Sequence, residues 1–593
     1  MFTSPLREIR FVMHELLDDS VLKTLYADVD YSPEFADNIV EEGGKFAENV
    51  LEPLNQSGDK EGAHWTPAGV VTPKGFREAY AAYMQAGWAQ LSVDVKSGGQ
   101  GMPHLINIAV EELMFASNMA FYVGTSLVRG AVETISASGN PQQAALILPR
   151  MVTGEWMGTM NLTESQAGSD LALLRTRAVA EGDHYRIFGQ KIFITYGDHD
   201  LTDNIIHLVL ARIDGAPPGT RGISLFFVPK NLINADGSLG APNDVRCISI
   251  EHKMGIHASP TCVMAFGEKD GAIGYLLGEP HTGLSHMFIM MNAARLSVGV
   301  QGLAQSERAL QQATAWARTR LQGKPAAGKG PGPVAIIEHP DVKRMLLSMR
   351  ARTEAMRALT YYAALELDCA HRLADQSARD AALARAELMI PIVKGWCTET
   401  AVDVTSIGIQ VHGGMGFVEE TGAAQFLRDV RISSIYEGTT GIQSNDLVGR
   451  KLGRDRGAAM AALIGDLLTE LNAARALTPP AKSIRNAAIE GLTQLRDATE
   501  SLLQQFTDKP ERALSVSVPY LQLCGLVLGG ALAARASVIA EAALQKTAQD
   551  SFYAAKLQTG HFYAEQLLPA APGLARIVKS GAGSVADADP ALI

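Results

Sequence analysis

The segment around Glu437 carries the side chain best suited to acid–base chemistry. It reads Ile-Tyr-Glu-Gly-Thr-Thr at residues 435–440. Behind Ile435 and Tyr436, a carboxylate in a closed apolar site would have a raised pKa and could accept a proton near neutral pH. Gly438 would let a substrate approach the backbone closely. An isolated Tyr-Glu-Gly string more simply marks a surface glutamate that ends a helix, so this assignment depends on the surrounding motifs.

The cysteines and histidines predict no metal site. The five cysteines include no CxxC pair and none has zinc-ligand spacing, so we expect reduced thiols in a cytoplasmic protein. His412 could suggest a metal ligand or a general base, but no second ligand stands near it in the sequence. We therefore expect no metal.

Length and charge narrow the class of protein. A single hydrophobic core stops growing near ~250–300 residues, so a chain of 593 residues should hold several domains. The 63 acidic residues outnumber the 52 lysines and arginines and give a net charge of −11. This balance disfavours a nucleic-acid binder, which normally has a basic surface. The first residues show no basic region followed by an apolar stretch, so we expect no signal peptide.

One uncharged stretch, residues 513–534, is long enough to span a bilayer. It also contains Ser515, Ser517 and Pro519, and its glycines suit close helix packing. We expect a buried core helix and no transmembrane segment. Peripheral contact with a membrane stays open.

The order of elements predicts an α+β multidomain protein. Residues 1–155 have apolar spacing typical of helices. Residues 156–280 contain alternating, β-branched runs at 191–195, 205–213 and 222–228, separated by turn residues, which indicates a compact antiparallel β domain. No GxGxxG follows a strand there, so a Rossmann site is not expected. Residues 281–450 return to long helices, two of them expected at about 341–373 and 378–407, with a Gly/Pro-rich loop at 323–333. Residues 451–593 predict an additional all-helical domain.

Five segments in this order resemble the motifs of the acyl-CoA dehydrogenase family. The first, residues 162–170, has Ser165 where the family usually has Pro. The second, residues 193–195, has Phe193 where Trp is usual. The others are residues 253–261, 410–416 and 428–443. The resemblance covers residues 1–450. The N-terminal start and the fourth domain resemble the large, extended branch with the 3-methylmercaptopropionyl-CoA dehydrogenases and large bacterial fatty acyl-CoA dehydrogenases.

This resemblance implies a fold and a reaction. The fold is an N-terminal helical domain, a central antiparallel β-barrel domain and a C-terminal four-helix bundle, here with an extra C-terminal all-α domain. The reaction is α,β-dehydrogenation of an acyl-CoA thioester to the trans-2-enoyl-CoA, as in the first step of fatty acid β-oxidation. Glu437 would remove the α-proton while flavin N5 takes the β-hydride. The Glu437 N–H and a ribityl hydroxyl would hold the thioester oxygen. Some relatives place the base where this chain has Ala294, which cannot accept a proton.

The resemblance also implies cofactor and substrate contacts. Threonine hydroxyls would bond the flavin edge, Phe193 would lie against the ring, and Arg320 would reach the pyrophosphate of a neighbouring subunit. In relatives, the arginine that matches Arg320 stands one residue further from the following glycine. The residues expected to bind FAD are Met160, Leu162, Thr163, Ser169, Phe193, Thr195, Arg320, Gln410, Gly413, Gly414 and Thr439. Those expected to bind substrate are Ser169, Asn292, Arg295, Tyr436 and Gly438.

The implied partners follow. Electrons would pass to an electron-transfer flavoprotein. FAD shared between subunits implies a homo-oligomer, with a dimer favoured and a dimer of dimers as the alternative. We expect a straight-chain fatty acyl-CoA as the substrate, with 3-methylmercaptopropionyl-CoA as the alternative. A different class would be a non-catalytic or DNA-associated flavoprotein homologue, which the absence of a strongly basic C-terminal region and the presence of Glu437 disfavour.

Overall fold

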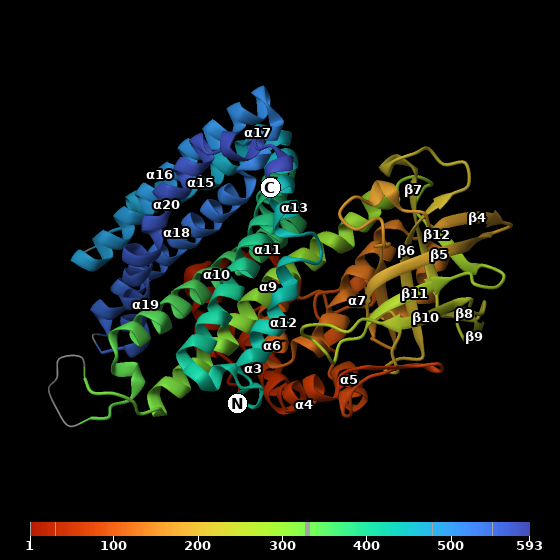
Figure 1. Ribbon diagram of the computed structural model, residues 1–593, viewed down its shortest axis with the longest axis horizontal. Coiled ribbons are helices and arrows are strands. Elements are labelled where there is room, and N and C mark those ends of the chain that lie inside the picture. The colour runs from red at the N-terminus through yellow and green to blue at the C-terminus, as the bar shows by residue number, and fades with distance from the viewer. Residues whose placement is uncertain (1, 30, 326–331, 477, 548) are drawn as a thin grey trace. The chain divides into compact units, whose positions relative to one another are not determined.

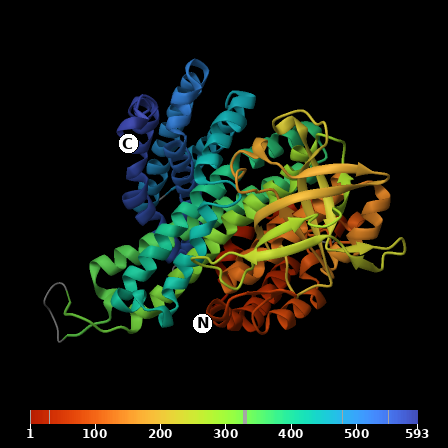
Figure 2. The ribbon, with the colours of Figure 1, turned by 45° about the vertical axis from the view of Figure 1, so that its right-hand side comes forward.

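The chain forms two compact units (Figures 1 and 2). The computed structural model describes all residues except 1, 30, 326–331, 477 and 548. Unit 1 comprises Met1–Gly44, His104–Ala116 and Val298–Ile593, and unit 2 comprises Lys45–Pro103 and Ser117–Ser297. Part of the predicted Gly/Pro-rich loop at 323–333 lies outside the described residues.

Unit 2 is built around an eight-stranded sheet with the order β10-β11-β5-β12-β7-β6-β3. Strand β4 pairs with both β5 and β6, which closes β5, β12, β7, β6 and β4 into a ring. The strands are β3 (Trp156–Asn161), β4 (Arg177–Glu181), β5 (His184–Thr195), β6 (Asn204–Ile213), β7 (Ile223–Pro229), β10 (Val245–Ile250), β11 (Thr261–Phe266) and β12 (Ala272–Leu277).

Most pairings in this sheet are antiparallel, as expected, but β3–β6 and β4–β6 are parallel. The sequence does not show this difference, because the direction of a strand relative to its neighbour depends on contacts between distant segments. Strand β7 and the first eight residues of β6 are buried throughout, as in the middle of a sheet covered on both faces. Ile187, Ile194, Val209, Phe226 and Val228 belong to one apolar core.

Helices and two hairpins complete unit 2. The N-terminal region, predicted as helical, includes a short hairpin of β1 (His64–Thr66) and β2 (Gly69–Val71). A second hairpin joins β8 (Asn231–Ile233) and β9 (Leu239–Pro242). The helices are α4 (Asn55–Glu61), α5 (Phe76–Gln85), α7 (Met119–Ser138) and α8 (Pro141–Val152), with the start of α9 (Gly283–Thr319).

Unit 1 is helical. Its long helices are α9, α10 (Pro340–Arg372), α11 (Gln376–His412), α16 (Pro479–Asp508) and α18 (Ser517–Lys546). The others are α1 (Leu6–Arg10), α2 (Ser20–Leu25), α3 (Pro33–Phe46), α6 (His104–Ser117), α12 (Ala423–Val430), α13 (Thr440–Asn445), α14 (Gly453–Asp455), α15 (Ala458–Ala473), α17 (Pro510–Ser515), α19 (Ser551–Phe562), α20 (Ala571–Ser580) and α21 (Gly583–Ala586).

A buried ion network ties helices of unit 1 together. Arg357 of α10 bonds Glu112 of α6 at 2.7 Å and Glu307 of α9 at 2.8 Å. The Tyr361 hydroxyl donates to Glu112 at 2.7 Å. Because a buried charge is costly unless it is paired and hydrogen-bonded, these contacts help to specify how the three helices pack.

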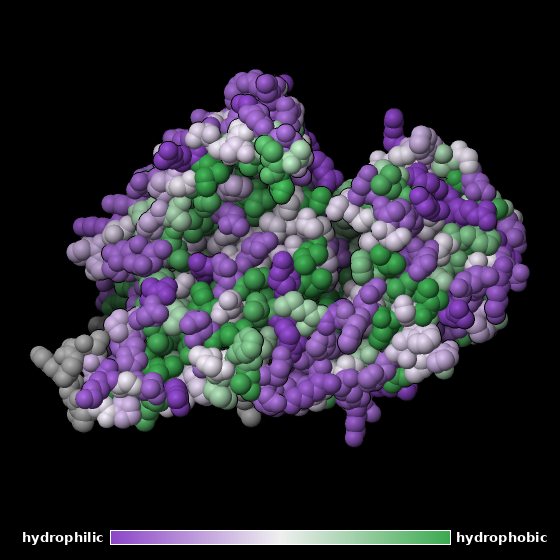
Figure 3. Space-filling model, in the orientation of Figure 1, coloured by the Kyte–Doolittle hydropathy of each residue, from purple (hydrophilic) through white to green (hydrophobic). Residues whose placement is uncertain are grey.

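Helix α18 contains most of the long uncharged stretch. Of the helices that the structure describes, it is the one with the length and hydropathy to cross a membrane, and 72% of its most apolar window is buried inside the protein. This burial fits the core helix that we predicted. On the face drawn in Figure 3, hydrophilic side chains are interspersed with hydrophobic ones. The absence of a transmembrane segment stays a prediction, and no described feature supports peripheral membrane contact.

Candidate active site

In unit 2 the first two motif segments lie side by side. The backbone N–H of Ile192 donates to the Thr163 carbonyl at 2.9 Å. The Lys191 ammonium donates to the Leu162 carbonyl, also at 2.9 Å. Leu162 and Thr163 follow directly after strand β3, and both are half-buried. The structure therefore brings together residues separated by about thirty positions in the sequence.

Glu164 shapes the first segment. Its carboxylate accepts hydrogen bonds from the Lys191 ammonium at 2.8 Å, from the Thr176 hydroxyl and N–H at 2.6 and 3.0 Å, and from the Arg175 N–H at 2.7 Å. Burial raises the pKa of this carboxyl, but Lys191 and the hydrogen bonds outweigh it and bring the pKa to about 2. Burial lowers the pKa of the Lys191 ammonium to about 8 despite the pull of Glu164. At neutral pH both groups are charged, and their pairing holds residues 162–176 in shape.

A β-bulge sets the conformation of Phe193. Strand β11 pairs Cys262 with Ile194 and Met264 with Lys191, so two residues of β5 face one residue of β11. Phe193 lies in this bulge with φ of 61°, and 58% of its side chain is exposed. Bulges often redirect a side chain beside a functional site. An exposed aromatic side chain held by strained backbone is more easily explained by a ligand that covers it than by packing within the chain.

The third motif segment, residues 253–261, pairs with the end of the second. Thr195 pairs with Thr261, and the Tyr196 N–H donates to the Pro260 carbonyl at 2.8 Å. Thr195 is half-buried, as is Met160 on β3, whereas Ser169 is exposed. Except for Ser169, the residues expected to hold the flavin in this unit therefore lie on strands or in segments bonded to them.

Helix α9 carries the residues expected near the CoA moiety. Asn292 is half-buried, and Arg295 and Ala294 are buried. Each lies in the part of the helix that belongs to unit 2. Alanine at position 294 has no group that could accept a proton, so the alternative position for the base carries no base in this chain.

In unit 1, Glu437 lies in a tight turn before helix α13. It does not end a helix, in contrast to the simpler interpretation of its sequence. Its φ is 55° and that of Gly438 is 90°, so two successive residues adopt the left-handed conformation. For a residue other than glycine this conformation costs about 1 kcal/mol or more, and such strain gathers at functional sites. Glu437, Tyr436 and Gly438 are half-buried, whereas Thr439 is exposed and caps α13 by accepting from the Ile442 N–H at 3.3 Å.

The side chain of Tyr436 is anchored to α9. Its hydroxyl donates to the Gln301 side-chain oxygen, and burial, followed by the charge of Glu437, raises the pKa of this phenol far above its ordinary value. This hydrogen bond fixes the ring of Tyr436, the residue before Glu437, against α9. Whether Tyr436 also contacts substrate, as the resemblance implies, stays a prediction.

Residues 410–414 lie at the end of α11. Gln410, Gly413 and Gly414 are exposed, and a Cβ added to either glycine would meet nothing within 4 Å. The positive φ of 62° at the end of α11 accounts for Gly413, whereas no contact within the described chain requires glycine at 414. Arg320 is exposed one residue beyond α9, where its carbonyl accepts from the Ile336 N–H at 2.8 Å.

His412 has a structural role. Its Nδ1 lies 2.7 Å from the Gly408 carbonyl, and its ring stacks on that of Trp316 at 5.3 Å. Burial lowers its pKa. Within the described residues there is no group of three or more His, Cys, Asp or Glu side chains that could hold a metal ion.

Four family models match consecutive parts of the chain. Residues 34–155, 159–268 and 281–453 match the N-terminal, middle and C-terminal domains of acyl-CoA dehydrogenases. Residues 459–589 match a model described as "Acetyl-CoA dehydrogenase C-terminal like".

Full-length relatives agree with these matches. A 3-methylmercaptopropionyl-CoA dehydrogenase of Ruegeria pomeroyi is 44% identical over 96% of each chain. The broad-specificity linear acyl-CoA dehydrogenase FadE5 of Mycobacterium tuberculosis is 33% identical over 100% of this chain and 99% of its own. A solved acyl-CoA dehydrogenase of Bacillus anthracis, complexed with FAD, shares the fold with a TM-score of 0.74 at 22% identity, covering 93% of this chain and 88% of its own.

The chain belongs to the acyl-CoA dehydrogenase family. It is an oxidoreductase of that family, and the expected fold class is confirmed. The family's cofactor is FAD, and the residues present fit it. The exposed Phe193 offers a face for a flat ring system, and the backbone at Gly413 and Gly414 is open to a bulky ligand.

Sequence reasoning missed four residues that shape the site. Lys191 and Glu164 support the first motif segment, while Gln301 and Lys394 reach the segment that contains Glu437. Lys394 had a visible signal, because it interrupts an otherwise apolar run from Met389 to Trp396, whereas Lys191 merely precedes the run at 192–195.

Proposed function

We propose that the protein catalyses α,β-dehydrogenation of an acyl-CoA thioester, with the Glu437 carboxylate as the base that removes the α-proton. The observation that carries this proposal is the strained, clamped turn at Glu437 and Gly438. Ala294, the alternative position for a base, supports it further. FAD, when bound, would supply the acceptor for the hydride from Cβ, while the electron pair of the broken Cα–H bond forms the Cα–Cβ double bond.

The side chains of this chain would divide the work. Glu437 takes the proton onto its carboxylate, and its backbone N–H donates to the thioester oxygen, where negative charge develops. Thr163 and Thr195 supply hydroxyls to the cofactor edge, and Phe193 packs against its ring. Gly438 leaves room for the acyl chain beside the base.

We propose the remaining CoA and FAD contacts from the motif segments. Asn292 and Arg295 face the CoA moiety. On a neighbouring subunit's cofactor, Arg320 binds the pyrophosphate and Gln410 the adenosine half. The last set of cofactor contacts comprises Met160, Leu162, Ser169, Gly413, Gly414 and Thr439.

For the substrate, 3-methylmercaptopropionyl-CoA is the first candidate, because a relative named for that activity matches 96% of this chain at 44% identity. A straight-chain fatty acyl-CoA is the second, since FadE5 is named for broad linear substrates. The sulfur compound and a five-carbon acyl chain are nearly isosteric near the reacting carbons. We therefore propose short acyl chains as the common substrate class.

The wider assignments follow from the same reaction. We propose an electron-transfer flavoprotein as the electron acceptor, a homodimer as the smallest active form and a cytoplasmic location. We also propose the domain limits 1–155, 156–280, 281–450 and 451–593. Sedimentation of the holoenzyme tests the oligomeric state, with a sharp monomer peak as the contradicting result.

A substrate panel tests the function. The holoenzyme is mixed anaerobically with C4 to C16 acyl-CoAs and with 3-methylmercaptopropionyl-CoA, and bleaching of the flavin band is followed. We expect 3-methylmercaptopropionyl-CoA to bleach the flavin band, and among the straight chains only C4 or C5 should match its rate. A rate that rises steadily to C16 would contradict the short-chain class, and no bleaching by any thioester would contradict the reaction.

A further inference from the structure

Lys394 is a fully buried lysine whose ammonium reaches the turn that carries Glu437. It lies in α11, three residues after Pro391, with an exposed fraction of 0%. Its Nζ donates to the Gly438 carbonyl at 2.5 Å. Burying an ammonium is costly unless strong partners compensate it. A lysine kept at such a position therefore needs a reason beyond packing, which a methionine of similar length would serve as well.

The turn that it reaches is strained and needs support. Glu437 and Gly438 both have positive φ, at 55° and 90°. Gln443 of α13, also with an exposed fraction of 0%, donates from Nε2 to the Glu437 carbonyl at 3.0 Å and to the Gly438 carbonyl at 3.2 Å. Lys394 and Gln443 thus hold the two carbonyls of the turn from two different helices.

This clamp also fixes the amide groups of the turn. In a trans peptide the C=O and the following N–H point in opposite directions. With the Glu437 carbonyl bonded to Gln443, the Gly438 N–H must point away from that side chain. With the Gly438 carbonyl bonded to Lys394, the Thr439 N–H must point away from the ammonium. Loss of either donor would let these peptide planes rotate and would move the side chain of Glu437 with them.

The backbone of Lys394 is itself held firmly. A Cβ on the next residue, Gly395, would lie 2.7 Å from Leu521 of α18. A Cβ on Gly525 would lie 2.0 Å from the Trp396 ring, so this indole lies directly on α18. Helix α18 belongs to the extra C-terminal part of the chain, which therefore supports the helix that carries Lys394.

We infer that Lys394, acting with Gln443, is a positioning residue that sets the conformation of the turn bearing the base. This inference rests on the proposed role of Glu437. It assigns Lys394 no contact with substrate or cofactor. The ammonium acts through the backbone carbonyl of Gly438, and the side chain of Glu437 carries the consequence.

Lys394→Met tests the inference in the holoenzyme. Methionine keeps the length and removes the donor. The rate constant of flavin reduction per bound FAD, measured anaerobically with saturating butyryl-CoA, should fall 10- to 100-fold, since a misplacement of about 1 Å can cost ~100-fold. The concentration of butyryl-CoA that half-saturates reduction should change less than threefold. Lys394→Arg keeps a charged donor and should recover at least part of the rate.

Lys556→Met is the matched control. Lys556 is also buried in unit 1 and is ion-paired with Glu8 and Glu354. Its loss should lower the melting temperature and leave the rate per bound FAD unchanged. A purely structural role for Lys394 would give this same pattern, so a parental rate per bound FAD in Lys394→Met would overturn the inference.

Two further variants complete the test. If Lys394→Met binds no FAD, Gln443→Met decides, because it removes the second donor of the clamp. A parental rate per bound FAD in that variant overturns the inference, and a 10- to 100-fold loss supports it. Glu437→Gln separates the two proposals. If it reduces its flavin at the parental rate, the base assignment fails; if it is inactive while Lys394→Met is not impaired, only the positioning role fails.

Discussion

Replacing Lys191 by methionine should loosen the segment that resembles the first flavin motif. The Lys191 ammonium is fully buried and lies 2.8 Å from the Glu164 carboxylate. Its removal leaves the Glu164 carboxylate, which is only 5% exposed, without the ammonium that pairs with it. Breaking one partner of a buried pair typically costs about 3–5 kcal/mol.

The pKa of Glu164 sets an upper limit on this cost, because its shift is shared between Lys191 and the hydrogen bonds from Thr176 and Arg175. Its folded-state value of about 2, against an ordinary 4.5, corresponds to roughly 3 kcal/mol. Because the pKa is lowered on folding, this stabilisation is present above about pH 4.5 and is lost as the pH falls toward 2. The variant should therefore lose stability at pH 7 and show a weaker further loss across that acid range.

Hydrogen exchange of the holoenzyme at pH 7 is the assay. Peptides covering residues 162–176 should exchange at least tenfold faster in Lys191→Met, and the FAD content should fall. Arg246→Met is the control, because Arg246 and its partner Glu268 are both largely exposed and their pair should contribute about 1 kcal/mol or less. Parental exchange in residues 162–176 would refute the reasoning.

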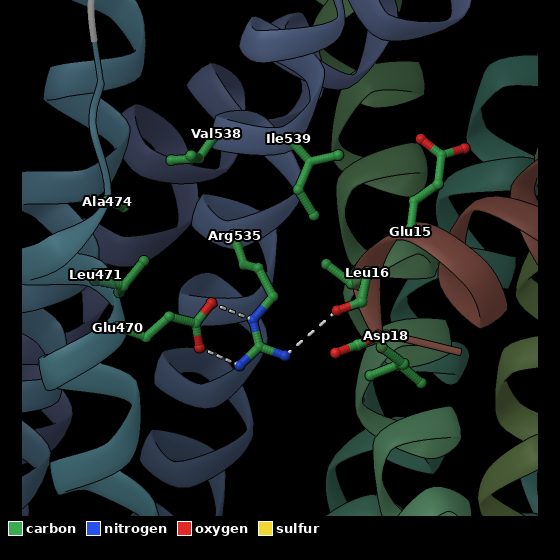
Figure 4. A pocket seen from close by; sticks show the side chains of 10 residues that line it. Glu15, Leu16, Asp18, Glu470, Leu471, Ala474, Arg535, Val538 and Ile539 are labelled. Carbon is green, nitrogen blue, oxygen red and sulfur yellow. Dashed lines mark hydrogen bonds and ion pairs between the residues drawn. The ribbon is translucent and has the colours of Figure 1, made fainter. Parts of the chain in front are cut away.

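Three further substitutions test other parts of the structure. Gly525→Ala should lower the melting temperature by several degrees, because its Cβ would lie 2.0 Å from Trp396, whereas Gly465→Ala in open space should leave it unchanged or raise it. Gly414→Ala also meets nothing within 4 Å, so it should leave stability unchanged and weaken FAD retention on dialysis; full retention would contradict a cofactor contact there. Arg535→Ala should cost about 0.5–1 kcal/mol by thermal unfolding, since its glutamate partner is 40% exposed, and a larger loss would mean that the pocket of Figure 4 matters more to folding.

That pocket has a volume of about 360 Å³ and joins the N-terminal segment to the C-terminal helices of unit 1. The Arg535 guanidinium bonds both oxygens of Glu470 and also the Leu16 carbonyl at 3.5 Å (Figure 4). These bonds engage all three nitrogens of the guanidinium. The pocket is therefore better explained as a packing interface between the N-terminal segment and the C-terminal helices than as an anion-binding site.

The sequence predicted the order of elements well, because long helices and buried strands leave strong periodic patterns. Strands expected near residues 191–195, 205–213 and 222–228 are β5, β6 and β7. Helices expected near 341–373 and 378–407 are α10 and α11. Parallel pairing of β3 with β6 could not be predicted, since it depends on contacts between distant segments.

The site was predictable in its residue types and not in its backbone. The motif strings identified Glu437 and Phe193, but neither positive φ angle has a local signal in the sequence. The bulge at Phe193 exists because β11 offers one residue where β5 has two. The clamp of Lys394 on Gly438 joins positions 44 residues apart, which no local pattern reveals.

The central claim is that Glu437 removes the α-proton, and one measurement tests it most directly. Anaerobic flavin reduction by 3-methylmercaptopropionyl-CoA and by butyryl-CoA is compared between the parent and Glu437→Gln at equal FAD content. Loss of a general base typically costs 10²–10⁴-fold, so the variant should bind thioester and reduce its flavin at least a hundredfold more slowly. Reduction at the parental rate would contradict the account.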